Sequence, residues 1–189
     1  MTFTDHYLRD HFLISMPHLH DRAFSQTVTY ICDHSEYGAM GLVINKSTEI
    51  SVNTLLNEVA IETEDNIILS DKSVLTGGPV QTDRGFVLHT GNQAWSSSIA
   101  LPNDINITTS KDILESLTTD NAPNDYLLTL GYAGWSAGQL EGELAENAWL
   151  TIEADHELLF HTPIEKRWEM AIKKLGINIS QLSSFTGHA

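Results

Sequence analysis

Residues 130–143 read LGYAGWSAGQLEGE and combine the end of an expected strand, a glycine turn and the start of an expected helix. Ser136 and Gln139 fit a capping box, in which the hydroxyl accepts from the N3 amide and the glutamine reaches back to the N-cap amide. Trp135 and Leu140 then stand where a hydrophobic staple places its two side chains. The stretch does not supply the lysine or the metal-binding hydroxyl pair of a phosphate-binding loop. We therefore interpret it as architectural, not catalytic.

Length and composition predict one globular domain spanning residues 1–189. The chain has 41% hydrophobic residues, and domains of about 100–200 residues are common. Its first residues lack the basic start and apolar run of a signal peptide, and no apolar stretch approaches the roughly 18 residues of a membrane span. Cys32 is the single cysteine, which excludes an internal disulfide. We expect a cytoplasmic protein without a membrane association.

The charge balance opposes binding to nucleic acid. Ten Lys and Arg face 25 Asp and Glu, a net charge of −15, and such a field repels phosphate backbones. One local exception is a set of basic residues that share one side of an expected helix: Lys166, Arg167, Lys173 and Lys174. We expect all four to be solvated, with the last two complementing the negative end of the helix. Direct nucleic-acid binding through this face ranks last among our hypotheses.

Strands outnumber helices in the pattern of apolar and turn-forming residues. Expected strands cover residues 12–14, 26–32, 40–45, 73–76, 85–89, 105–108 and 126–130. Expected helices begin at Ser51, Ser110, Ser136 and Thr162, the third ending near Trp149 and the last stopping at Gly176. Residues 34–38 have the length of a hairpin loop, with Gly38 available for a positive φ. Neighbouring hairpins before the helices favour an α+β fold over a regularly alternating parallel sheet.

Several long motifs occur in a fixed order along the chain. They are Phe12-Leu13-Ile14 with Met16-Pro17 and Asp21, Phe24 with Thr27-Val28 and His34, residues 38–45, Gly77-Gly78-Pro79-Val80, residues 84–89, residues 131–143 and Asn147-Ala148-Trp149-Leu150. On these motifs the chain closely resembles the bacterial AlgH/YqgE family, from about the first strand to the C-terminus.

The resemblance implies a compact α+β fold in which a mixed, bifurcated sheet curls into a flattened pseudo-barrel with helices packed outside. It implies little chemistry, because it brings neither catalytic residues nor a cofactor. Family members are commonly labelled candidate transcriptional regulators, from a link to the control of alginate production. With a net charge of −15, an indirect regulatory role is more physical than direct contact with DNA.

Two groups of residues could be mistaken for chemical sites. Cys32 and His34 are two apart on an expected strand, so both side chains would leave the same face. A thiolate–imidazole pair is conceivable, but a cysteine in an apolar strand is usually a buried small hydrophobe, and His34 is better placed to anchor the hairpin loop. His18, His20 and Asp21 lack visible third and fourth ligands, so we predict no metal.

The remaining candidates form a possible ligand or partner surface. Gly77, Gly78 and Pro79, followed by Arg84 and His89, mark either a tight corner of a sheet or a ligand pocket with Arg84 as a cationic clamp. We prefer the corner. A second group follows one helix edge at a spacing of four, where it could face water or a partner: Gln139, Glu143 and Asn147, with Trp135 at the head of the helix.

These observations predict a non-enzymatic regulatory or binding protein that acts through a protein or a small-molecule partner, with no cofactor. The alternative is a small hydrolase-like enzyme with a pocket between the Gly77–Pro79 corner, His34 or His89, and the Trp135 helix. We assign no catalytic residue.

Overall fold

The computed structural model describes residues 7–17, 19, 21–63, 67–93 and 95–184. The two candidate metal ligands His18 and His20 lie outside the described residues. The strands are β1 (His11–Ser15), β2 (Val28–Ser35), β3 (Gly38–Val43), β4 (Ser47–Ser51), β5 (Ser73–Thr76), β6 (Val80–Thr90), β7 (Ser98–Ala100), β8 (Ile105–Thr108), β9 (Tyr126–Ser136) and β10 (Trp149–Glu153).

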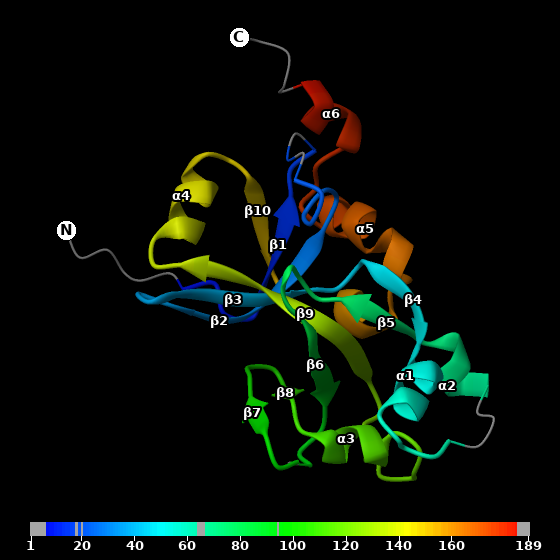
Figure 1. Cartoon of the computed structure of the whole chain (residues 1–189). Coiled ribbons are helices and arrows are strands. Elements are labelled where there is room, and N and C mark those ends of the chain that lie inside the picture. The colour runs from blue at the N-terminus through cyan, green and yellow to red at the C-terminus, as the bar shows by residue number, and fades with distance from the viewer. Residues whose placement is uncertain (1–6, 18, 20, 64–66, 94, 185–189) are drawn as a thin grey trace.

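Short helices connect and cover these strands (Figure 1). They are α1 (Val52–Glu58), α2 (Ile67–Asp71), α3 (Lys111–Ser116), α4 (Gln139–Ala145), the π-helical turn η1 (Glu157–His161), the 3-10 turn η2 (Ile164–Lys166), α5 (Arg167–Lys174) and α6 (Ile179–Ser184). No helix that the described residues form has the length and hydrophobicity needed to cross a membrane.

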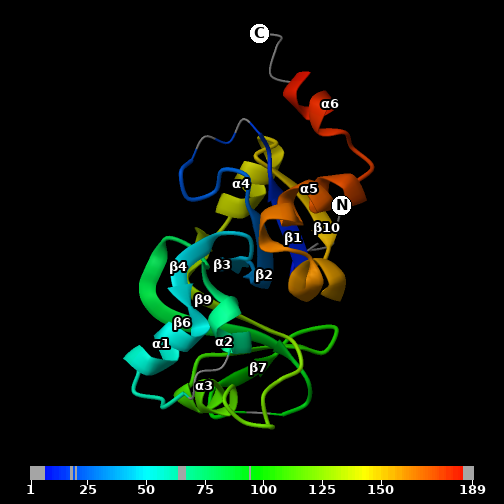
Figure 2. The ribbon, with the colours of Figure 1, turned by 90° about the vertical axis from the view of Figure 1, so that its right-hand side faces the viewer.

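The strands form one mixed sheet that curls strongly into a half-barrel (Figure 2), as the predicted α+β fold requires. Its main path runs β10-β1-β2-β3-β9-β6-β8-β7, and β4 and β5 branch from it. The branch arises at β9, because its first half pairs in parallel with β5 and its second half pairs antiparallel with β3. The expected bifurcation is therefore confirmed.

Gly77 occupies the fork of the sheet. Its carbonyl accepts from Val43 N at 2.7 Å, and its own N–H donates to Leu130 O at 2.8 Å, so it joins the two branches. A Cβ on Gly77 would stand 2.3 Å from Gly131 O. Glycine is needed here because two backbones approach more closely than any side chain allows.

Three hydrophobic clusters fill the spaces between sheet and helices. The largest lies in the curve of the sheet, where Ala171 and Ile172 of α5 pack on β1 and β2. A second lies under α1, α2 and α3. The third binds α4 to β9 and β10 through Trp135, Leu140 and Trp149. α4 thus covers the outer face of the sheet, whereas α5 packs inside its curve.

The structure corrects the expected start and end of α4. β9 continues through Ser136, and Gly138 at φ 75° is the N-cap, so the expectation that Ser136 caps the helix is wrong. Half of the predicted capping box is present, because Ser136 N donates to Gln139 Oε1 at 3.0 Å. The helix ends at Ala145, and Trp149 begins β10, a strand that the sequence pattern did not predict. Cross-strand pairing of β1 with β10 overrode the helical pattern there.

The C-terminal segment also differs from the single helix expected from Thr162 onward. The 3-10 turn η2 and then α5 replace it, and Thr162 is the C-cap of the preceding π-helical turn η1, not the N-cap of a helix. Gly176 stops the helix as predicted, with φ 72° and its N–H donating to Lys173 O at 3.0 Å.

The predicted cap Ser51 is confirmed, since its side chain accepts from Thr54 N. The short strands β4 and β7 were not predicted, because three to five residues carry too little pattern.

Candidate functional site

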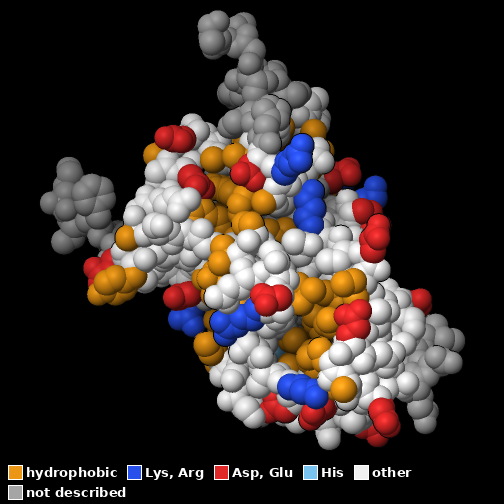
Figure 3. Space-filling view, in the orientation of Figure 1, with side chains coloured by type: hydrophobic (Ala, Val, Ile, Leu, Met, Phe, Trp, Pro, Cys, Tyr) orange, Lys and Arg blue, Asp and Glu red, His pale blue; other side chains and the backbone are white. Residues whose placement is uncertain are grey.

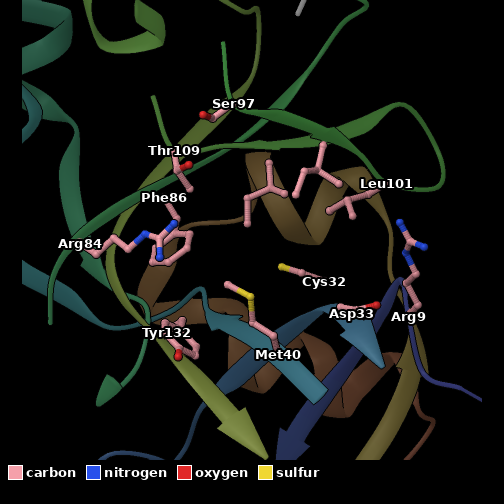
Figure 4. Close-up of a pocket in the computed structure, with 12 residues that line it drawn as sticks. Arg9, Cys32, Asp33, Met40, Arg84, Phe86, Ser97, Leu101, Thr109 and Tyr132 are labelled. Atoms are coloured by element: carbon pink, nitrogen blue, oxygen red, sulfur yellow. The ribbon is translucent and has the colours of Figure 1, made fainter. Parts of the chain in front are cut away.

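A cavity of about 570 Å³ opens inside the curve of the sheet, between the β2–β3 hairpin, β6, β9 and the β7–β8 hairpin (Figure 4). Its walls come from six strands and from the turn before β1. The lining residues are Arg9, Cys32, Asp33, Met40, Arg84, Phe86, Ser97, Ile99, Leu101, Ile107, Thr109 and Tyr132. A volume in this range suits one small organic molecule.

The walls of the cavity are mostly hydrophobic. Phe86, Leu101 and Ile107 are buried around it, while Met40 and Tyr132 are half-buried and pack against the same cluster. Ile99 is 62% exposed although it is a large aliphatic side chain, and it stands at the edge of the cavity. An exposed Ile at such an edge is a surface that a bound molecule would remove from water.

A charged group lies on each side of these hydrophobic walls. In Figure 4, Arg84 stands on one side beside Phe86, and Arg9 stands with Asp33 on the other. The Arg84 guanidinium lies 5.3 Å from the centre of the Phe86 ring and donates to Gln81 Oε1 at 3.3 Å. Arg9 donates to Ala100 O at 3.2 Å. Figure 3 shows basic side chains beside hydrophobic ones between the β2–β3 and β7–β8 hairpins.

Cys32 points into the middle of the cavity because of a β-bulge. The register between β2 and β3 shifts between Ile31 and Asp33, which leaves Cys32 as the extra residue. Burial raises the pKa of the Cys32 thiol well above its usual value, and Asp33 adds to the rise. A neutral thiol of this kind is a poor nucleophile.

The same bulge separates Cys32 from His34, so the expectation that both leave one face of the strand is wrong. Cys32 belongs to the cluster inside the curve, whereas His34 turns toward α4. His34 Nδ1 accepts from Leu8 N at 2.9 Å, and its Nε2 lies 2.8 Å from Glu141 Oε1. This pattern fits the neutral tautomer with its proton on Nε2, donating to the carboxylate. His34 thereby ties the chain before β1 to α4.

Along α4, the predicted surface residues Trp135, Gln139 and Glu143 make contacts within the protein, although Gln139 and Asn147 are exposed. Glu143 Oε2 accepts from Trp135 Nε1 and from Trp149 Nε1, each at 2.8 Å. Gln139 Nε2 donates to Glu143 Oε1 at 2.9 Å. Asn147 has φ 57° and donates its N–H to Leu144 O, which ends the helix. The structure brings Trp135, Gln139 and Glu143 together, but to fix α4 on the sheet.

The remaining predicted residues lie in separate places. Gly77 and Gly78 form the fork, where a Cβ on Gly78 would stand 2.1 Å from the Tyr132 carbonyl carbon, and Pro79 follows them. His89 is fully buried, with Nε2 2.8 Å from Thr108 Oγ1, and burial lowers its pKa. Of the residues predicted for the surface, Arg84 alone lines the cavity.

Most lining residues were missed by the sequence reasoning. Arg9, Asp33, Ile99 and Leu101 come from segments without a motif, and only the curl of the sheet brings them together. Met40, Phe86 and Tyr132 lie in the motifs of residues 38–45, 84–89 and 131–143, which were the signals available.

Two further groups that the sequence singled out are the four basic residues near the C-terminus and the candidate metal ligands. Arg167 is buried, so the expectation that all four basic residues are solvated is wrong, and Lys174 pairs with Asp155 at 2.6 Å. Within the described ranges no group of three or more His, Cys, Asp and Glu side chains could hold a metal ion.

Comparisons with known proteins place this arrangement in one group. The family model described as AlgH-like matches residues 12–180. A UPF0301 protein of Pseudoalteromonas translucida is 54% identical over 182 residues, covering 96% of this chain and 98% of the relative. A UPF0301 protein of Serratia proteamaculans is 53% identical over 185 residues, covering 96% and 99%. These names state no reaction, ligand or partner.

Solved structures share the fold. The solution structure of the AlgH protein from Pseudomonas aeruginosa is 43% identical, with a TM-score of 0.79 and complete coverage of both chains. A crystal structure of a Corynebacterium diphtheriae protein has a TM-score of 0.74 at 18% identity, covering 93% of this chain and 91% of that one. At that identity the second likeness concerns the fold alone.

Proposed function

The chain belongs to the AlgH-like family, and we propose that it is a non-enzymatic binding protein whose cavity takes a small amphipathic anion. The supporting observation is the cavity's composition: hydrophobic walls with two arginines and one aspartate among the lining residues, in a chain with a net charge of −15. Two cations gathered at one cavity in such an acidic protein favour an anionic ligand there.

The geometry supports a defined orientation of the ligand. Its hydrophobic body would lie against Phe86, Met40 and Ile107, and its acidic group would meet Arg84. Arg84 is held over Phe86, so its planar donor fork is already positioned for a carboxylate, sulfonate or phosphate. Binding would also cover Ile99, whose exposed surface then contributes to affinity.

A regulatory role, which the family resemblance implies, would follow from the position of the cavity. Its walls come from the β2–β3 hairpin on one side and from the β7–β8 hairpin on the other. A ligand that contacts both hairpins would favour the conformation in which the two hairpins are close enough to bind it. A protein partner could recognise that ligand-bound conformation. We propose no reaction, because the lining offers a thiol of raised pKa and the carboxylate of Asp33 but no histidine.

The test uses anilinonaphthalene sulfonate, an aromatic body with one sulfonate, as a fluorescent probe of the native full-length chain. We expect saturable binding that weakens about fivefold in Arg84→Gln, because one charge-assisted contact is lost. Ile99→Asp should weaken it further by placing a negative charge at the edge. Decanoate should displace the probe more effectively than decanol, which lacks the charge.

Arg22→Gln is the matched control, since Arg22 is exposed and does not line the cavity. It should bind the probe as the wild type does. Equal affinity in wild type, Arg84→Gln and Ile99→Asp would place the probe elsewhere and overturn the proposal, as would the absence of saturable binding.

A further inference from the structure

A second, smaller cavity lies where the C-terminal helices meet the β5–β9 branch of the sheet. It measures about 200 Å³ and is lined from four separate stretches of the sequence: Val52, Asp71, Lys72, Ser73, Leu75, Tyr126, Leu127, Leu128, Phe160, Ile164 and Arg167. None of these residues lines the larger cavity. In Figure 1 this region lies beside β5, with the C-terminal turns behind it.

Arg167 is the first unusual feature of this cavity. The side chain is 2% exposed, and its guanidinium donates to two neutral acceptors, Thr162 O and Ile44 O. Among the described residues no carboxylate lies within 4.0 Å to form an ion pair with it. Burial lowers the pKa of Arg167 to about 10, and Glu165 opposes the change. A buried cation is ordinarily paired, so this one lacks its usual partner.

Lys72 brings a second cation to the same cavity. Its Nζ lies 3.9 Å from the centre of the Tyr126 ring, and the described residues again provide no ion pair for it. Burial lowers the pKa of Lys72, and Asp125 opposes the change. The exposed carboxylate in the lining, Asp71, leaves the three charged groups with a net charge of +1.

Tyr126 supplies an independent observation. The residue is 9% exposed and lines the cavity, and its hydroxyl is buried without a hydrogen-bond partner in the described structure. An unpaired buried hydroxyl costs about 1–3 kcal/mol, so such groups usually have a ligand, a water or a protein partner. The cavity is thus lined by two cations without an ion pair among the described residues and by one hydroxyl without a hydrogen-bond partner.

We propose that this cavity binds a small oxyanion, a phosphate or a carboxylate, held by Arg167, Lys72 and the hydroxyl of Tyr126. The anion would accept hydrogen bonds from all three groups and offset the buried guanidinium charge. The volume fits a free ion or the end group of a small metabolite rather than a larger ligand. The site joins α2 and β5 to α5, so occupancy would fasten the C-terminal helices to the branch of the sheet.

Inorganic phosphate and acetate are the probes, titrated separately into the full-length protein at constant ionic strength and followed by isothermal calorimetry and amide NMR. We expect saturable phosphate or acetate binding with shifts at the amides of Lys72, Tyr126 and Arg167. Lys72→Gln should weaken it about tenfold, because one charged donor is lost. The anion that binds with the higher affinity indicates whether the natural ligand carries a phosphate or a carboxylate.

Tyr126→Phe separates a ligand site from a structural role. Removing an unpartnered hydroxyl should leave the thermal midpoint of the free protein unchanged or raised, yet weaken anion binding about fivefold. Lys111→Gln, which removes an exposed lysine elsewhere, and Arg84→Gln, which changes the larger cavity, should both bind the anion as the wild type does.

The test variants Lys72→Gln and Tyr126→Phe leave Arg167 in place. Substitution of Arg167 itself can prevent folding, because its side chain ties α5 to Ile44. The proposal is overturned if neither anion binds saturably, or if both Lys72→Gln and Tyr126→Phe bind it with wild-type affinity. Either result leaves the proposal for the larger cavity untouched, since that rests on a different probe and different residues.

Discussion

Trp135 and Trp149 share a single hydrogen-bond acceptor, Glu143 Oε2, although they belong to different strands. Their ring centres are 6.1 Å apart and nearly perpendicular, and the Phe24 ring packs against both. One carboxylate therefore satisfies two buried indole N–H groups and fixes α4 between β9 and β10. Both carboxylate oxygens of Glu143, which the sequence placed on a possible ligand or partner surface, are engaged in holding the fold.

Glu143→Ala should lower the free energy of unfolding by about 2–4 kcal/mol, because two buried donors lose their acceptor. Glu143→Gln retains an acceptor oxygen and should cost much less. Urea denaturation followed by circular dichroism measures both, without relying on tryptophan emission. Two variants that are equally stable, and close to wild type, would contradict this account.

Gly77→Ala should destabilise the fork by about 3 kcal/mol or more, because its Cβ would overlap Gly131 O at 2.3 Å. Gly85→Ala in β6 is the matched control, since a Cβ there meets no atom within 4 Å. Thermal unfolding of the two variants provides the comparison. Similar midpoints for both would show that the fork tolerates a side chain.

Cys32 should react with Ellman's reagent only after unfolding. The thiol is 3% exposed, and burial raises its pKa, so little thiolate is available at pH 8. Denatured protein should release one equivalent, since the chain has one cysteine. Rapid, stoichiometric reaction of the native protein would instead indicate an accessible and activated thiol.

Stability should fall between pH 7 and pH 5 in part because of His89. Burial lowers its pKa in the folded protein below the unfolded value of about 6.5, so the unfolded chain takes up the proton first. The contribution of His89 to the free energy of unfolding is fully present above the unfolded pKa and is lost as the pH falls through the folded pKa. His89→Gln should therefore show a shallower decline in the free energy of unfolding.

His161 provides the opposite comparison. The hydrogen bond to Asp125 raises the pKa of His161. The contribution of His161 to the free energy of unfolding is therefore present at low pH and is lost as the pH rises through its pKa in the folded protein. His161→Gln should make the decline toward pH 5 steeper than in wild type. Parallel curves for wild type and both variants would show that neither histidine is linked to folding.

Local chemistry let the sequence determine the fold class and most of the strands. β5 and β8 match their predicted limits because alternation and turn residues bound them. Gly38 and Gly176 were identified because a positive φ favours glycine in any context. The ordered motifs identified the family, and with it the curled, bifurcated sheet. The edge strand β10 was not predicted, because its pairing with β1 joins residues far apart in the sequence and leaves no local pattern.

The tertiary structure alone decided the two cavities. The bulge at Cys32 reverses the alternation of β2, sending Cys32 and His34 to opposite sides, and no periodicity in the sequence shows where it occurs. Arg9 and Arg84 come to one cavity, and Lys72 and Arg167 to another, only because the sheet curls and its C-terminal helices fold back on it. Sequence patterns report neighbours along the chain, whereas a binding site is made by groups that meet across it.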